Sequence, residues 1–285
     1  MLIGFIGVGM MGGGLARNLI RAGKEVIVYD LNSAAIEKTL AAGSSGRAAI
    51  DINELSTADV VFTSLPLPGH VTGVMLGVDG LLGKMKSGST YIEVSTIDPG
   101  TARSLSDAAE AEGIKFLQCP LGKTPAHAES GEVPIFVGGK QEVYEEMKDL
   151  LEVIGKPVYL GAVEASSAFK LISNLIGMTN LVVLSEGIRI AERAGIDRNI
   201  LLDLLNDTGA KSFQMDVRGP WIAKDDFKNR FGLDLALKDV RLGCEMAKAW
   251  GNDAKTMRVA LDYFREGSAA GHGTEDCNAV YKIIK

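Results

Sequence analysis

The chain has 285 residues, of which 46% are hydrophobic and 23% charged, with a formal net charge of −6 at pH 7. This length allows two domains, and the composition is ordinary for a globular protein. The negative charge, without a basic stretch that carries interleaved aromatics, argues against a nucleic-acid partner. The three cysteines lie far apart and the three histidines lack ligand spacing, so we expect neither a disulfide framework nor a metal site.

The N-terminal segment is apolar, but it has no basic region and no cleavage signal, so we do not expect a signal peptide. No apolar run reaches the roughly 18 residues that span a bilayer. Widely spaced cysteines suit a reducing compartment. From these observations we expect a cytoplasmic protein that does not use a membrane.

The first expected element is a short strand at residues 2–6, which breaks at glycines and continues into a helix at 15–22. The glycines follow the pattern G-x-G-x-x-G at Gly7, Gly9 and Gly12. In dinucleotide-binding folds the first glycine permits a tight turn, the second lets a pyrophosphate approach the backbone, and the third lets the helix pack on the strand. The helix N-terminus then faces the phosphates.

A second apolar strand, residues 25–29, ends at Asp30, 18 residues after the third glycine. A carboxylate near this spacing holds the ribose 2′-hydroxyl of a dinucleotide. It would repel the 2′-phosphate of NADP, and Leu31 and Asn32 offer that phosphate no arginine, so the sequence favours NAD over NADP. The alternative is that Asp30 caps the next helix together with Asn32 or Ser33.

Strands and helices keep alternating through the first half. We expect strands at residues 58–65, 89–95, 114–118, 133–139 and 158–160, and helices at 34–41, 71–76, 99–112 and 141–154. This alternation predicts an α/β fold with a doubly wound, mainly parallel Rossmann-type sheet. Ligands of such sheets bind beyond the carboxyl ends of the strands. We therefore expect the ligand site to include Leu65, Pro66, Ser95, Thr96 and the loop after Gln118.

From about residue 164 the pattern becomes helical. Apolar residues recur at helical spacing, and residues 165–194 contain no proline, which predicts one helix about 45 Å long at 1.5 Å per residue. The recurring positions are Phe169, Ile172, Ile176, Thr179 and Val183. We expect this helix to join a sheet domain, 1–162, to an all-α domain, 163–285, with further helices at 198–205, 213–223, 233–250, 253–266 and 276–284. One sheet domain cannot cover so long a helix, so we expect a partner subunit to bury one face, in a homodimer or homotetramer.

Lys170 and Asn174 lie four residues apart on the long helix and therefore share a face. The sequence neighbours of Lys170 are mostly apolar, and desolvation can lower the pKa of such a lysine enough for it to exchange a proton with a substrate hydroxyl. The alternative is a lysine whose amine reaches solvent, and the spacing alone favours this alternative.

Four segments resemble, in order, those of the β-hydroxyacid dehydrogenase family, which includes 3-hydroxyisobutyrate dehydrogenase, tartronate semialdehyde reductase and sulfolactaldehyde reductase. They are GVGMMG at 7–12, EVSTIDP at 93–99, KLISN at 170–174 and LDLALKD at 233–239, and the resemblance covers essentially the whole chain. It implies that Lys170 is the catalytic acid/base and that Asn174 orients the substrate.

The resemblance also implies the binding residues. The cofactor would contact Gly7, Val8, Gly9, Met10, Met11, Gly12, Asp30, Leu31, Asn32, Leu65, Pro66, Thr96 on the nicotinamide side, and Lys238 from the helical domain. The small anionic substrate would contact Ser95, Gly122, Lys123, Thr124, Lys170, Asn174 and Lys238.

One segment departs from the family pattern. Where most members have D-A-P-V-S-G-G, this chain has QCPLGKT at 118–124. The usual Ser-Gly-Gly binds a substrate carboxylate. Gly122, Lys123 and Thr124 would instead offer a charge and a hydroxyl, which suit a sulfonate or a second carboxylate. The loop is similar to the G-R-T of sulfolactaldehyde reductase, although a lysine lacks the bidentate fork of arginine. The alternative is that Lys123 points to solvent; we expect His127 and Cys119 to be structural.

We therefore expect an NAD-dependent oxidoreductase that interconverts a small anionic 3-hydroxy acid, or a sulfonate analogue such as that of sulfolactaldehyde reductase, and its semialdehyde. The alternatives within this class are 3-hydroxyisobutyrate dehydrogenase and tartronate or succinic semialdehyde reductase. The related imine reductases replace the catalytic lysine, whereas this chain retains it as Lys170. A non-catalytic dinucleotide-binding protein would not need Lys170, Asn174, Thr96 and Lys238 together.

Overall fold

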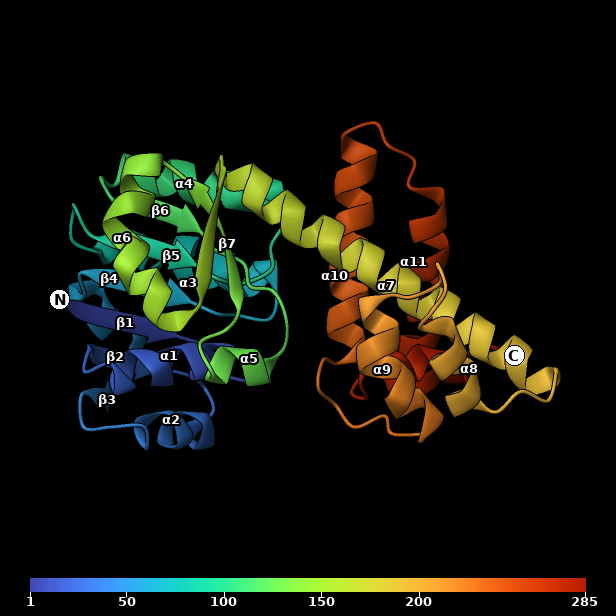
Figure 1. Ribbon diagram of the computed structural model, residues 1–285. Coiled ribbons are helices and arrows are strands. Elements are labelled where there is room, and N and C mark those ends of the chain that lie inside the picture. Colours follow the sequence, from blue (N-terminus) through green and yellow to red (C-terminus); the bar gives the residue numbers. More distant parts are fainter. The chain divides into compact units, whose positions relative to one another are not determined.

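The computed structural model describes all 285 residues. Contacts divide the chain into two units, Met1–Lys170 and Leu171–Lys285, the first α/β and the second helical (Figure 1). The division falls later than the predicted boundary after residue 162, because the first turns of the long helix α7 (Val163–Arg193) pack with the sheet unit. There the Ser166 hydroxyl donates to the Gln118 carbonyl at 3.0 Å.

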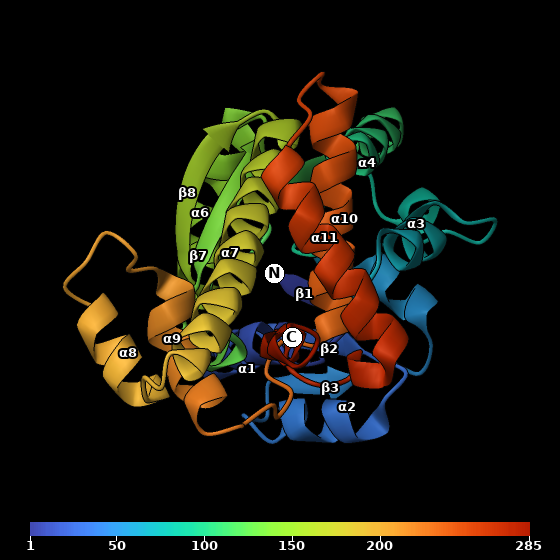
Figure 2. The ribbon, with the colours of Figure 1, turned by 90° about the vertical axis from the view of Figure 1, so that its right-hand side faces the viewer.

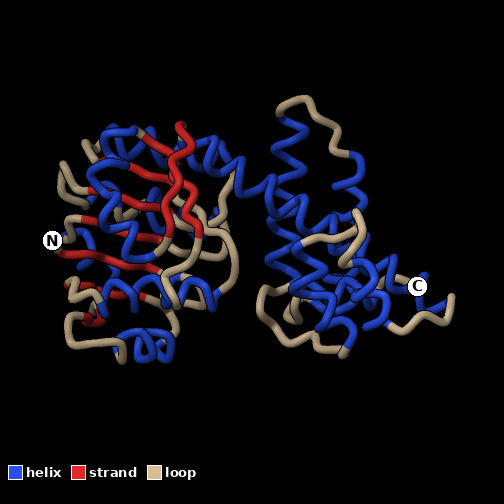
Figure 3. The backbone as a smooth tube through the Cα atoms, in the orientation of Figure 1, coloured by secondary structure: helices blue, strands red, loops and turns tan.

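An eight-stranded sheet forms the centre of the first unit, in the order β3-β2-β1-β4-β5-β6-β7-β8 (Figure 3). Every neighbouring pair is parallel except β6 and β7, which confirms the predicted doubly wound sheet. The strands are β1 (Leu2–Ile6), β2 (Glu25–Tyr29), β3 (Gly46–Ala48), β4 (Val60–Thr63), β5 (Thr90–Glu93), β6 (Lys115–Gln118), β7 (Pro134–Gly139) and β8 (Lys156–Gly161).

Helices cover both faces of this sheet, as Figure 2 shows for α6 on one side and α3 and α4 on the other. Side chains alternate along a strand, so Phe5 of β1 enters the core that contains Leu15 and Leu19 of α1, whereas Ile6 enters the core under α3 and α4. The helices are α1 (Gly12–Arg21), α2 (Ser33–Leu40), α3 (Pro68–Leu76), α4 (Pro99–Ala111), α5 (Pro125–Glu129) and α6 (Gln141–Ile154).

The second unit packs α7, α8 (Arg198–Leu205), α9 (Phe213–Ala223), α10 (Leu233–Ala249) and α11 (Lys255–Gly267) around its own core. The helix predicted at 276–284 is present but shorter, and it is not an α-helix. The segment Cys277–Lys282 is a 3₁₀-helix, in which residues three apart lie above each other, and this places Cys277 and Val280 together in the core.

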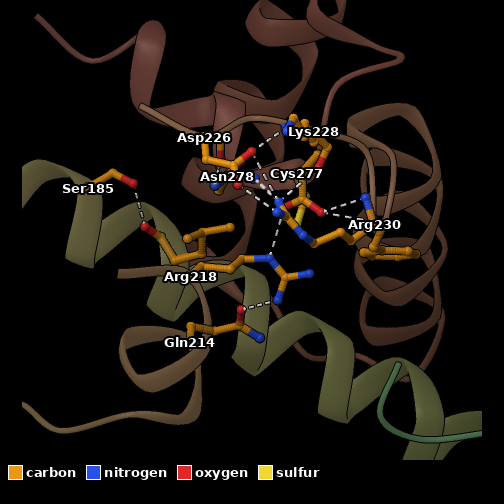
Figure 4. Close-up of polar contacts among 11 residues, drawn as sticks. Ser185, Gln214, Arg218, Asp226, Lys228, Arg230, Cys277 and Asn278 are labelled. Carbon is orange, nitrogen blue, oxygen red and sulfur yellow. Dashed lines mark hydrogen bonds and ion pairs between the residues drawn. The ribbon is translucent and has the colours of Figure 1, made fainter. Parts of the chain in front are cut away.

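A buried ion pair fixes the start of this 3₁₀-helix. Arg218 extends from α9 toward the segment that carries Cys277 and Asn278 (Figure 4). Its Nε lies 3.1 Å from Oδ1 of Asp276, a fully buried carboxylate. The other oxygen of Asp276 accepts the Phe231 backbone N–H at 2.9 Å. These bonds hold the backbone on the N-terminal side of Cys277, where the 3₁₀-helix begins.

Within the chain, α7 packs a different apolar face from the positions that recur in the sequence pattern, and the expected burial of one face by a partner subunit stays a prediction. Leu171, Leu175 and Leu181 are buried, whereas Ile172 and Val183 are 43% and 56% exposed. The helix carries apolar residues on two faces, and periodicity does not tell which face packs. Its length and a mean hydropathy of 1.4 also satisfy the criteria for a membrane-spanning helix, which a core helix of a globular unit satisfies equally.

Candidate active site

The glycine turn between β1 and α1 leaves one open side. Gly7 has a φ of +86°, and a Cβ there would overlap the Ser64 carbonyl, just as a Cβ on Gly12 would overlap the Gly7 carbonyl. A Cβ on Gly9 would meet nothing within 4 Å. No side chain caps the N-terminus of α1, so the turn and the helix dipole fit a pyrophosphate on the Gly9 side.

Asp30 braces this turn. One carboxylate oxygen accepts the Val8 N–H at 2.8 Å, and the other accepts the Asn32 N–H at 2.8 Å. The cap of α2 is Asn32 alone, whose Oδ1 accepts the Ala34 N–H at 3.1 Å. The alternative in which Asp30 caps that helix is therefore wrong. Around the turn, Met10 is 52% and Leu31 92% exposed, and Met11 is half-buried.

The carboxyl ends of β4, β5 and β6 meet at Ser95. Its hydroxyl oxygen accepts the Leu65 N–H at 2.7 Å, and its carbonyl accepts the Gln118 amide at 3.2 Å. Thr96 follows, half-buried, and Pro66 is exposed. The ends of three strands are therefore fixed in the crevice where ligands of doubly wound sheets bind.

The buried carboxylate of Glu93, which was not predicted as a site residue, fixes the backbone of Ser95. Oε1 of Glu93 accepts the Ser95 N–H at 2.6 Å, and Oε2 accepts the hydroxyls of Thr63 and Tyr91 at 2.5 Å and 2.6 Å. Burial raises the pKa values of the Glu93 carboxyl and of the Tyr91 phenol. The sequence signal was a charged residue at the inner end of an otherwise apolar strand.

The loop that replaces Ser-Gly-Gly has a constrained backbone. A Cβ on Gly122 would lie 2.5 Å from Cγ of Pro134, so the close approach of β7 leaves no room for the usual serine. Lys123 has a φ of +62°, in the left-handed region, and its side chain is exposed. The Thr124 hydroxyl lies 2.8 Å from Nδ1 of His127, which gives His127 a direct contact with a predicted substrate residue.

Lys170 lies one turn beyond Ser166 on α7 and is half-buried. Since residues four apart share a helix face, Lys170 continues the face that begins where Ser166 contacts the end of β6. Its neighbour Phe169 packs on Phe136 of β7, with ring centroids 4.5 Å apart. The predicted proton-transfer residue therefore belongs to the sheet unit.

In the helical unit, Asp239 of α10 holds two of the predicted site residues. The Asn174 amide donates to Oδ2 of Asp239 at 2.5 Å, and Nζ of Lys238 lies 2.8 Å from Oδ1. Asp239 is 2% and Lys238 8% exposed. Asp239 was not predicted as a site residue. Its signal was an acidic residue in helical register with the apolar positions Ala236 and Leu242, three residues before and after it.

Neither a metal centre nor a reactive thiol is built from the remaining side chains. No group of three or more His, Cys, Asp or Glu residues is placed to hold a metal ion. Cys119, Cys244 and Cys277 are buried free thiols, and burial raises the pKa of each. A buried thiol with a raised pKa is a weak nucleophile, which agrees with the structural role expected for Cys119.

Comparison with known proteins identifies two family models that together cover the chain. Residues 2–163 match the NAD-binding domain of 6-phosphogluconate dehydrogenase, and residues 165–284 match the NAD-binding domain of NADP-dependent 3-hydroxyisobutyrate dehydrogenase. The chain is 31% identical to 2-(hydroxymethyl)glutarate dehydrogenase of Eubacterium barkeri, over 99% of this chain and 94% of that protein. It is 30% identical to the NAD-dependent L-serine dehydrogenase of Pseudomonas aeruginosa, over 99% and 97%.

Solved structures show the same relationship. The crystal structure of 3-hydroxyisobutyrate dehydrogenase from Salmonella typhimurium matches the fold with a TM-score of 0.90 at 28% identity, over 100% of both chains.

Proposed function

Because the chain belongs to the 3-hydroxyisobutyrate dehydrogenase-like family of β-hydroxyacid dehydrogenases, we propose that it interconverts a small anionic 3-hydroxy acid, or a sulfonate analogue, and the corresponding semialdehyde. It is an NAD(P)-dependent oxidoreductase with a Rossmann-type NAD-binding domain. The substrate, the preference for NAD and the roles of individual residues are the proposed part.

Lys170 is the proposed acid/base. Bound NAD supplies the hydride chemistry at the carbinol carbon. During oxidation the Lys170 amine accepts the hydroxyl proton, and during reduction it returns that proton to the forming alkoxide. Asn174 orients the substrate, and its amide is itself oriented by Asp239 at 2.5 Å. The position of Lys170, one turn beyond a contact with the end of β6, supports this assignment.

Lys123 is the proposed selector of the substrate. The compounds in the names of the relatives, 3-hydroxyisobutyrate, L-serine and 2-(hydroxymethyl)glutarate, share a hydroxymethyl group beside a carboxylate and differ in the remaining substituent. The single observation that carries the proposal is that Lys123 adopts a left-handed backbone, φ +62°, which costs a non-glycine residue about 1 kcal/mol. Strain of this kind collects at functional sites. An exposed ammonium here favours a substituent that is an anion.

A sulfonate fits this loop as well as a carboxylate does. Its three oxygens can accept from the Lys123 ammonium and from the Thr124 hydroxyl without the planar geometry that a bidentate arginine requires. The specific proposal is therefore a sulfolactaldehyde reductase-like activity. The second candidate is a carboxylate substrate, as in 3-hydroxyisobutyrate dehydrogenase or tartronate or succinic semialdehyde reductase, and the relatives favour it.

Asp30 supports a preference for NAD. Its carboxylate is fixed by two backbone N–H groups at 2.8 Å, so it cannot swing away from a 2′-phosphate, and Leu31 and Asn32 supply no positive charge.

For assembly we propose a homodimer or homotetramer in the cytoplasm. Exposed Ile176, Val183 and Ile190 on α7 and three free thiols support these proposals; a stable monomer in light scattering would contradict the first.

The test is turnover on a substrate panel with both dinucleotides. The panel contains 3-hydroxyisobutyrate, glycerate, tartronate semialdehyde, succinic semialdehyde, sulfolactaldehyde and dihydroxypropanesulfonate. We expect Lys123→Ala to raise KM at least tenfold for the two sulfonates and to leave KM for 3-hydroxyisobutyrate unchanged, while Lys123→Arg keeps the preference. Lys148→Ala, which removes an exposed lysine of α6, is the matched control. Equal turnover of the preferred substrate by Lys123→Ala would refute the role of Lys123.

A further inference from the structure

The substrate loop is joined to the dinucleotide turn through a contact between two helices. Thr124 is followed directly by α5, and α5 lies beside α1, the helix that begins at the glycine turn (Figure 1). A Cβ on Gly14 of α1 would lie 2.9 Å from the backbone carbon of Ala128 and from the nitrogen of Glu129. Only glycine permits this approach, so the two helices meet backbone to backbone.

Polar side chains of α1 fix α5 at this contact. Nε of Arg17 donates to both oxygens of Glu129, at 2.9 Å and 3.1 Å. Arg21 adds an ion pair to the same carboxylate at 2.5 Å, and the Asn18 amide donates to the Ala128 carbonyl at 2.8 Å. Together these contacts fix the C-terminal end of α5 to α1.

The Arg17 pair differs from an ordinary surface ion pair. Arg17 is only 8% exposed, and a buried guanidinium requires a partner in a fixed geometry. The two guanidinium groups hold the pKa of the Glu129 carboxyl at about 2, so the carboxylate is charged throughout the range in which an enzyme works. A bidentate pair also specifies orientation, which a single point contact does not.

We propose that Arg17 and Glu129 are positioning residues that couple occupancy of the dinucleotide turn to binding of the substrate anion. This inference rests on the proposed function, in which Lys123 and Thr124 contact the substrate. A dinucleotide on the Gly9 side immobilises the N-terminal turns of α1. Because α5 is fixed to α1, the loop immediately before α5 is immobilised as well. Coupling between two sites is reciprocal, so substrate binding tightens cofactor binding by the same factor.

The experiment measures four affinities in the full chain. NADH is titrated by fluorescence with and without an unreactive dianion, malonate, and malonate is titrated by calorimetry with and without NADH. We expect each ligand to tighten the other at least fivefold in the native protein, within the usual range of coupling. In Glu129→Gln the factor falls to about one, KM of the substrate rises at least fivefold, and Kd of NADH alone stays within twofold.

Two further variants separate positioning from general destabilisation. Glu146→Gln removes the exposed Lys115–Glu146 ion pair, 2.6 Å between β6 and α6, and should leave the coupling factor unchanged. Arg17→Lys keeps the charge but loses the fork, and should show intermediate coupling. An unchanged coupling factor in folded Glu129→Gln would overturn the inference, as would an equal rise in Kd of NADH alone.

The outcome also distinguishes this inference from the proposed function. If Lys123→Ala raises KM but Glu129→Gln does not alter the coupling, the anion site stands and the coupling fails. If Lys123→Ala has no effect while Glu129→Gln abolishes coupling, the helix contact acts on the site through another part of the loop, and the assignment of Lys123 fails.

Discussion

Replacing Asp239 with asparagine tests whether the Asn174–Asp239–Lys238 cluster serves catalysis or only stability. Across 2.8 Å, two unit charges at an effective dielectric constant of about 20 attract by about 6 kcal/mol. Desolvation of a buried pair can cancel this attraction, but removal of one partner leaves the other charge buried without compensation and typically costs about 3 kcal/mol. A loss of that size lowers Tm by about 12 °C for the helical unit, Leu171–Lys285, at an unfolding entropy of about 2.1 cal/mol/K per residue.

The asparagine can still accept from Asn174, but it no longer neutralises the Lys238 ammonium, so we expect both side chains to shift. A shift of about 1 Å in a positioning group lowers kcat/KM on the order of 10²-fold. The double variant Lys238→Met/Asp239→Leu removes both charges. It should recover most of the stability, because a hydrophobic pair replaces a buried ion pair at little cost, but none of the activity.

Urea unfolding and steady-state kinetics separate the two effects. Asp203→Asn, at an exposed aspartate of α8, is the control and should change neither quantity. If Asp239→Asn loses stability but keeps kcat/KM within twofold of the native value, the cluster only stabilises the helical unit and the reasoning is wrong.

Three further predictions concern the sheet unit. Gly9→Ala should fold normally, because its Cβ meets nothing within 4 Å, yet it should raise Kd of NADH at least tenfold. Gly12→Ala should raise this Kd and also lower Tm. Fluorescence titration measures the Kd and thermal unfolding measures the Tm. Asp30→Asn keeps an acceptor for the Val8 N–H but removes the charge, so the ratio of kcat/KM for NADP to that for NAD should rise at least tenfold, and an unchanged ratio would place NAD selection elsewhere. Arg17 and Arg21 lower the folded pKa of Glu129 from 4.5 to about 2, so its contribution is present above about pH 4.5 and lost as pH falls toward 2. Because the Glu129 side chain is 40% exposed, Glu129→Gln should destabilise by only about 1 kcal/mol at pH 7 and by nothing near pH 2, as measured by urea unfolding across pH.

The nucleotide half was predictable because its signals are local. Gly7, Gly9, Gly12 and Asp30 are separated by short distances in the sequence, and Gly7 and Gly12 each have a steric requirement that no other residue meets. The strands around them are apolar runs of ordinary length. By contrast, β3 has three residues and α5 has five, which is too short for any periodicity to appear. The antiparallel pairing of β6 and β7 also has no local signal.

The supporting carboxylates were not predictable from the same information. Arg17 and Glu129 are 112 residues apart in the sequence, and Asn174 and Asp239 are 65 apart. A charged residue in an apolar stretch shows that a partner is required, but it does not identify the partner. The face of α7 that packs within the chain was not predictable for a related reason, since two of its faces are apolar and only the packed core decides between Leu171 and Ile172.

The carboxylates that the sequence did not assign share one physical role. Glu93 accepts from the Ser95 N–H, Asp239 from the Asn174 amide, and Glu129 from the guanidinium of Arg17. Each fixes a hydrogen-bond donor from behind, so its orientation no longer depends on the ligand. Lys123 has an exposed side chain on a strained loop backbone, unlike these buried or half-buried groups. Substitution of Lys123 should therefore change which anion binds, while substitution of one of these carboxylates should weaken the binding of every substrate alike.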